Sequence, residues 1–346
     1  MDLYYFNILM VFIYGFLINS SHLRYKNRCF LGVACIHLLC IHALRDPFVF
    51  LDTNNYLAVF NLVSTNNSFE ELLNDKYTLF RFEPGYIIFN YIVSRISQSD
   101  YAIFVVSSFI IVLGYLYPVY RYSKSPFLSV LIILLYPLIF QQSFFVIRQH
   151  MACAICMFGL PFIEKRKFCL FLLILLIASS FHYSAVILFP LYFIYNLQLS
   201  RINLRFAILL FIAFFVLRYG ISYVANTNSR YEGYVDGAGN FLVFGLFLIT
   251  TFLFVKFVRH KFFLIENPKD RIVIVYNLYS LVISFALLGM SIGRLTNYFT
   301  YFLCIIIAFL YNELPRHLGF LVVLFFLLFV LYLNSKMVDF TYQSFL

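Results

Sequence analysis

Long apolar runs occupy most of this chain and restrict it to one class of fold. The runs at 3–18, 101–120 and 318–333 approach the length of about 20 residues that a helix needs to cross a hydrocarbon core. Only 12% of the residues are charged and 63% are hydrophobic, whereas soluble domains contain roughly 25% charged residues. We therefore expect an all-α polytopic membrane protein.

Apolar runs of this kind predict about 12 transmembrane helices, within a range of 10 to 13, in one integral membrane domain covering residues 1–346. The first run lacks the basic start and small-residue cleavage site of a signal peptide, so we expect it to be retained. The run 85–96 is too short to span and is expected to be interfacial or re-entrant. The candidate spans lie near 3–18, 30–44, 101–120, 127–143, 149–163, 168–181, 183–197, 206–220, 240–257, 272–290, 297–312 and 318–333.

Basic residues are distributed unevenly between the loops that these spans create. One set of alternate loops holds 16 of the 25 Lys and Arg residues, but only four of the 15 Asp and Glu residues. Basic loops stay in the cytoplasm, so we expect both termini and a loop at 45–100 to face the periplasm. The net charge of +10 is then explained by topology and does not indicate a nucleic-acid partner. The basic loops are 19–29, 121–126, 163–168, 198–205, 256–271 and 312–317.

The expected outer loop contains seven of the 15 carboxylates and is the first candidate for chemistry. After Arg45, Asp52 and Tyr56 are four residues apart, so a helix would place both on one face. A carboxylate beside a phenol can act as a general base or bind a sugar. Asp52 is equally consistent with a helix N-cap, and the two roles are compatible.

The end of this loop reads Arg81-Phe82-Glu83-Pro84-Gly85. Pro84 biases Glu83 toward an extended backbone, and Gly85 permits a turn that other residues resist. Such a turn is expected to aim Glu83 inward. The alternative is a loop-to-helix junction with an exposed ion pair.

Several polar side chains are embedded in apolar sequence farther along the chain. Arg148 precedes Gln149, and its planar fork suits a phosphate, although an Arg at the end of a span can also snorkel to the interface. His182 is either a proton carrier or phosphate donor, or a structural His that bonds to the backbone. Arg294 is a second embedded Arg, with Tyr298 about one helical turn later.

No Walker, HExxH, GxSxG or zinc-deaminase motif occurs. Cys153 and Cys156 have the spacing of a metal or redox pair, but no second pair accompanies them. Because they lie inside an apolar run, we interpret them as small residues on a helix face. Neither a metal nor a cofactor is expected.

Taken in order, these motifs resemble the EpsG-type membrane polysaccharide polymerases, which overlap with the Wzy-type O-antigen polymerases. The resemblance covers roughly residues 45–300. The matching stretches are Arg45…Asp52-x-x-x-Tyr56, Glu83-Pro84-Gly85, Ile147-Arg148-Gln149, the basic turn Glu164-Lys-Arg-Lys167 followed by Phe181-His182-x-Ser184, and Arg294…Tyr298.

The resemblance implies a GT-C-like, metal-independent glycosyltransferase. Such enzymes join undecaprenyl-diphosphate-linked oligosaccharide repeats of O-antigen or exopolysaccharide at the periplasmic face of the bacterial inner membrane. The implied partners are the lipid-linked donor and acceptor and membrane lipids, together with a chain-length regulator and a flippase. The implied catalytic residues are Asp52, Glu83 and His182, and the implied substrate-binding residues are Arg45, Tyr56, Arg81, Arg148, Gln149, Arg294 and Tyr298.

A lipid-oligosaccharide flippase or another transporter is the main alternative. Transporters of that kind are often built from inverted repeats, with broken helices near the midplane. No internal symmetry is evident in this sequence, and the embedded polar groups gather at one expected face.

Overall fold

The computed structural model describes residues 3–46, 51–65, 82–197, 218–220, 223, 241–257, 267–288 and 293–336, without the side chains of Leu3, Leu51, Gly293, Arg294 and 334–336. This part of the chain is helical and contains no strand. The predicted all-α class is therefore confirmed. Arg81 lies outside the described residues, and only 218–220 of the predicted span at 206–220 lie within them.

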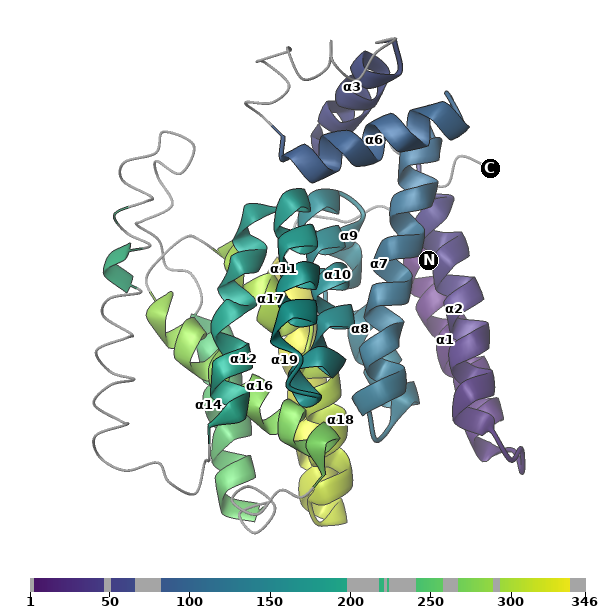
Figure 1. Ribbon diagram of the computed structural model, residues 1–346. Coiled ribbons are helices and arrows are strands. Elements are labelled where there is room, and N and C mark those ends of the chain that lie inside the picture. Colours follow the sequence, from purple (N-terminus) through teal and green to yellow (C-terminus); the bar gives the residue numbers. More distant parts are fainter. Residues whose placement is uncertain are drawn as a thin grey trace.

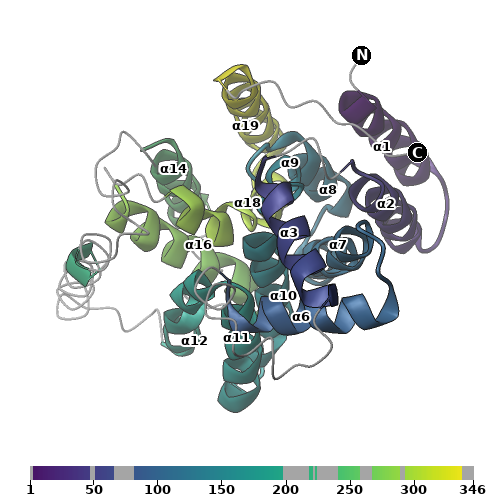
Figure 2. The ribbon, with the colours of Figure 1, turned by 90° about the horizontal axis from the view of Figure 1, so that it is seen from above.

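The first part of the chain forms two long antiparallel helices and two helices that lie across one end of the molecule. Helices α1 and α2 stand side by side, and α7 packs against α2 (Figure 1). Helices α3 and α6 cross over the end of the bundle when the molecule is seen from above (Figure 2). The bounds are α1 (Leu3–Ser20), α2 (Lys26–Ala43), α3 (Leu51–Thr65), α6 (Pro84–Ile96) and α7 (Ala102–Tyr122).

The central part of the chain alternates between helices and irregular turns. Helix α10 packs between α7 and α11 (Figure 1). The bounds are α8 (Pro126–Leu135), α9 (Phe140–Ser143), α10 (Ile147–Glu164), α11 (Phe168–Phe181), the 3-10 helix η2 (Tyr183–Leu188) and α12 (Phe189–Asn196).

The remaining described helices pack around α16 and α18. Helix α14 lies against α16, and α18 contacts both α8 and α19. The bounds are α14 (Phe241–Phe257), α16 (Pro268–Ala286), η4 (Gly293–Thr296), α17 (Asn297–Thr300), α18 (Leu303–Glu313) and α19 (Arg316–Lys336).

Two of the predicted spans are interrupted where the sequence disfavours a helix. The run 127–143 ends as α8 at Leu135, because Pro137 biases Tyr136 away from the helical conformation. The run 183–197 starts as a 3-10 helix and becomes α-helical near Pro190. By length and composition, α7 and the part Arg316–Leu333 of α19 are candidate membrane spans in the described chain. The total of about 12 spans therefore stays a prediction.

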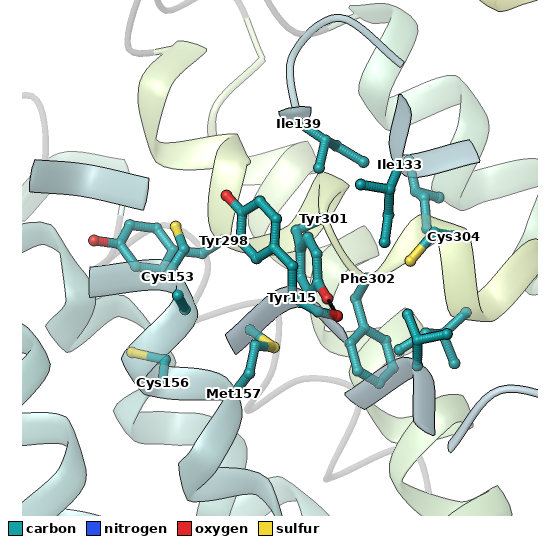
Figure 3. Packing of buried hydrophobic residues seen from close by; sticks show 14 of the residues in the cluster. Tyr115, Ile133, Ile139, Cys153, Cys156, Met157, Tyr298, Tyr301, Phe302 and Cys304 are labelled. Atoms are coloured by element: carbon teal, nitrogen blue, oxygen red, sulfur yellow. Dashed lines mark hydrogen bonds between the residues drawn. The ribbon is translucent and has the colours of Figure 1, made fainter. Parts of the chain in front are cut away.

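Small residues and aromatic rings pack the centre of the bundle. A Cβ atom on Gly114 would lie 2.5 Å from Cβ of Ala154, so the glycine lets α7 approach α10 closely. Tyr115 and Tyr301 stack with ring centroids 4.3 Å apart, and the Tyr301 hydroxyl donates to the Tyr115 carbonyl (Figure 3). This dense core fixes the ends of the helices that carry the polar residues.

The outer surface of the bundle is strongly apolar. Phe16 on α1, Leu176 on α11, Phe252 on α14 and Leu331 on α19 are each more than half exposed. Water-soluble proteins rarely expose apolar side chains over several neighbouring helices. The exposed faces of these helices are therefore suited to contact with lipid chains.

Ion pairs join the helices at the end of the bundle far from α6. Lys124 after α7 lies 3.2 Å from Asp270 on α16 and also pairs with Glu313 on α18. Arg121 on α7 lies 2.8 Å from Glu164, the last residue of α10. Helix α10 thus has this ion-pair cluster at its last residue and Arg148 in its first turn, so the length of the helix separates the two.

Candidate active site

The turn before α6 places Glu83 at the end of the helix bundle. Pro84 is the first residue of α6, and Glu83 has an extended backbone with φ −70° and ψ 145°. The Glu83 side chain makes no capping bond to α6. A Cβ atom on Gly85 would lie 2.7 Å from Cβ of Ser180, so the glycine allows the turn to press against the end of α11.

Glu83 is held by two cationic or polar partners from different helices. Nδ1 of His182 lies 2.8 Å from one carboxylate oxygen, and Nη1 of Arg148 donates to the other oxygen. The Glu83 side chain is 8% exposed. Three segments far apart in the sequence thus meet at one buried carboxylate.

The partners of Glu83 keep its carboxylate ionised. Burial on its own would raise the pKa of Glu83, but the hydrogen bond from His182 and the positive charge of Arg148 together outweigh that effect. The net result is a pKa below the ordinary value of 4.5. The structure therefore shows a loop-to-helix junction with an ion pair in which Glu83 is buried and Arg148 is 22% exposed.

Arg148 lies in an aromatic cage beside Glu83. Its guanidinium carbon is 4.6 Å from the ring centre of Phe82, 5.9 Å from Tyr56 and 6.0 Å from Tyr86. Cations are attracted to the faces of such rings. An Arg that only snorkels would extend into water, whereas this one is directed at a buried carboxylate. Its proposed contact with substrate remains a prediction.

Helix α3 brings Tyr56, but not Asp52, to this cluster. The two residues are one turn apart on α3, and the Tyr56 ring packs edge-on against Tyr86 with centroids 5.7 Å apart. Asp52 lies in the first turn, where a carboxylate also stabilises the helix N-terminus. Among the described residues, it makes no ion pair with Arg148 or His182.

One ring nitrogen of His182 bonds to Glu83, and the other has no side-chain partner in the described part of the chain. Its extended backbone ends α11, with φ −158° and ψ 115°. Nδ1 faces Glu83, which favours the tautomer that donates from Nδ1 and leaves a lone pair on Nε2. In the described part of the chain no side chain bonds to Nε2, and the His182 side chain is 27% exposed.

A second polar cluster borders the first. The Asn297 amide donates to the side-chain oxygens of Gln142, at 2.7 Å, and Gln149, at 3.4 Å. The hydroxyls of Tyr298 and Ser184 lie 3.1 Å apart. Gln149 and Tyr298 were expected from the sequence. Gln142 and Asn297 were not, because isolated amides in apolar runs match no motif.

Arg45, expected to bind substrate, lies within the protein. Its side chain is fully buried, donates to Ser108 at 3.1 Å and bonds to the carbonyl of His42. The rings of Phe104 and Phe144 lie 5.2 and 5.8 Å from its guanidinium carbon. These contacts connect α2 to α7 and α9, so Arg45 positions the helices that carry the site. The spacing His42-x-x-Arg45 was the sequence signal for this role, because residues three apart at a helix end can contact each other.

Of two further candidate residues, the structure describes only the backbone of one. Arg81 lies outside the described residues, as does the side chain of Arg294. The backbone of Arg294 belongs to η4, immediately before Asn297 and Tyr298. No group of three potential metal ligands occurs among the described residues. Cys153 and Cys156 are buried free thiols in α10.

The sequence was compared with known protein families, curated proteins and solved structures. The sequence matches the EpsG family over residues 28–346, a range that includes every residue of both polar clusters. No curated protein and no solved structure matches the chain.

Proposed function

Because the chain belongs to the EpsG family, the family of Wzy-type polysaccharide polymerases, we propose that it is a glycosyltransferase that joins lipid-linked oligosaccharide repeat units. The observation that supports this most is the contact of Glu83 with both His182 and Arg148. The cluster combines a group that can accept a proton with a fixed cation that can bind a phosphate. Polymerisation of diphosphate-linked sugars requires both.

His182 is the general base in this proposal. The hydroxyl of the acceptor sugar attacks the anomeric carbon of the donor, and its proton passes to Nε2 of His182. Glu83 holds the ring and stabilises the imidazolium that forms, as the buried carboxylate does in a Ser-His-Asp triad. Both Glu83 oxygens already have partners, so Glu83 is better suited to orient the base than to be the base.

Arg148 stabilises the leaving group. As the bond between the anomeric carbon and the diphosphate oxygen breaks, negative charge develops on the diphosphate. A cation held in place before the reaction lowers the energy of that charge without reorganisation. Arg294, next to the second polar cluster in sequence, is proposed as the second cation. Tyr56 on α3 lies beside Arg148 and then borders the diphosphate, with Asp52 one turn farther from the cluster.

We place this reaction at the periplasmic face of the bacterial inner membrane, in a multi-pass, GT-C-like chain. Two features support this orientation. The basic loops gather on the opposite side in the predicted topology. The Lys124 ion-pair cluster marks that opposite end of the bundle.

The proposed substrates are undecaprenyl-diphosphate-linked repeats, which serve as donor and as acceptor without a metal. A chain-length regulator and a flippase are the proposed protein partners.

Deletion of the coding sequence tests the function. Cells without a polymerase are expected to carry one repeat unit on each surface carrier molecule. Loss of a flippase would instead leave no exported repeat at the surface. Polymer formation from purified lipid-linked repeat by the purified chain, in the presence of a metal chelator, would establish the activity directly.

A further inference from the structure

The second polar cluster is made of amides that interact across three segments. Gln142 is in α9, Gln149 is in the first turn of α10, and Asn297 begins α17. Asn297 and Gln149 are buried, whereas Gln142 is only partly buried. The Gln142 oxygen accepts from Asn297. In the described part of the chain its own NH₂ group makes no hydrogen bond and is not sealed from solvent.

Chain adjacency and hydrogen bonds link this cluster to Glu83 in a closed ring. Gln149 follows Arg148 directly, and Tyr298 follows Asn297. Tyr298 contacts Ser184, which is two residues after His182. Because Arg148 and His182 both contact Glu83, the ring returns to its starting point.

In this closed series of contacts, Asn297 and Tyr298 of α17 contact Gln149 and Ser184, which are close in sequence to Arg148 and His182. The amide groups therefore lie toward α17. A ligand that reaches Nε2 of His182 from this side therefore lies near the amides. Neutral amides suit hydroxyl groups, because each amide offers both a donor and an acceptor.

We propose that Gln142, Gln149 and Asn297 form the subsite that binds the hydroxyl groups of the acceptor sugar. This inference rests on the proposed polymerase function and assigns the acceptor to this side of the ring. Asn297 fixes the two Gln oxygens, so the NH₂ group of Gln142 points a donor at the ligand. The diphosphate of the donor substrate then occupies the side of Arg148.

The alternative is a purely structural amide cluster. Such clusters are common in buried positions, where every polar atom needs a partner. The partial exposure of Gln142 and its unused donor argue against that role. Gln141 supplies a matched control, because it is the neighbouring amide in α9 and is not part of the cluster.

Binding of the free repeat-unit oligosaccharide tests the inference. Mild acid removes the lipid diphosphate from the cellular lipid-linked pool, so the released oligosaccharide keeps the hydroxyl groups that the acceptor subsite recognises but lacks the diphosphate that Arg148 is proposed to bind. Its affinity for the purified full-length chain would be measured by titration calorimetry. Gln142→Leu is expected to weaken binding roughly 3–10-fold, as loss of one hydrogen bond does. Gln141→Leu is expected to bind as the unchanged protein does.

Gln142→Glu provides a second variant if Gln142→Leu does not fold. It keeps the oxygen that accepts from Asn297 but has no NH₂ group, so the same loss of affinity is expected. Unchanged affinity in both variants would overturn the acceptor subsite and leave the polymerase function intact. Failure of the unchanged protein both to bind the oligosaccharide and to polymerise lipid-linked repeat would overturn the proposed function, and the subsite with it.

Discussion

Glu83 accepts a 2.8 Å hydrogen bond from Nδ1 of His182, although 99 residues separate the two in sequence. The same carboxylate binds Arg148 through its other oxygen. The proposed base, its orienting carboxylate and the proposed phosphate-binding cation therefore form one connected unit. Substitutions within such a unit are expected to be non-additive, because each one disturbs the contacts of the others.

His182→Asn should abolish most activity while keeping the fold. The Asn amide can still donate to Glu83, but it cannot accept a proton as imidazole does. Loss of a general base lowers turnover by about 10²–10⁴-fold. Rates of polymer formation from purified lipid-linked repeat would measure the effect. Retention of more than about a tenth of the activity would show that the proton goes elsewhere. Loss of a general base typically lowers the rate by at least about 10²-fold, which would leave about a hundredth of the activity.

Acidification should reveal how Glu83 contributes to stability. The pKa of Glu83 in the folded chain lies below the ordinary value of 4.5, so the folded state favours the ionised form. Its contribution is present above pH 4.5 and is lost as the pH falls through the lower folded pKa. The difference in unfolding free energy between the unchanged protein and Glu83→Gln should thus shrink below that pH. A difference that is constant or larger in acid would contradict the assignment.

The sequence predicts the class of fold and part of the site. Hydropathy alone predicts an all-helical chain, because apolar runs of this length have few other structures available. The turn at Glu83 was also predictable, since Pro84 restricts its backbone. The pairing of Glu83 with Arg148 was not, because no local rule connects residues 65 positions apart.

Other features of the site depend on tertiary packing that no motif encodes. From the sequence, Asp52 is a candidate general base, because a helix would place Tyr56 on the same face. The structure brings Tyr56 to Arg148 and gives the contact with His182 to Glu83. Asn297 joins the cluster only because α17 packs against α10. Such contacts between distant helices require the folded chain.

Arg148→Lys should separate charge from geometry. A Lys ammonium preserves a positive charge near Glu83, so the chain should remain folded. It cannot offer the planar fork that binds two phosphate oxygens. Polymerisation is expected to fall about 10²-fold, while binding of the free oligosaccharide, which has no diphosphate, stays the same. Polymer of full length from the Lys variant would favour an Arg that acts only structurally.

The position of the site relative to the membrane can be checked with introduced cysteines. In a variant without the seven native cysteines, Asn55→Cys on α3 should react with an impermeant thiol reagent in intact spheroplasts. Lys167→Cys, in the basic turn before α11, should react only after lysis. Both residues are exposed in the structure. Labelling of Lys167→Cys alone in intact spheroplasts would reverse the proposed orientation.

Gly85→Ala tests whether the close approach of α6 to α11 positions Glu83. The added methyl group would lie 2.7 Å from Cβ of Ser180 and closer still to its hydroxyl oxygen, so α6 must shift outward. Overpacking of this kind costs about 1–3 kcal/mol. The shift should also lengthen the contact between Glu83 and His182 and lower the polymerisation rate. Ser180→Ala removes the nearest atom, so the double variant should recover part of both the stability and the rate. Because Ser180 contacts neither Arg148 nor His182 in the described structure, recovery in the double variant would identify packing at Gly85 as the cause. Unchanged stability and rate in Gly85→Ala alone would show that the close approach of α6 to α11 is not needed.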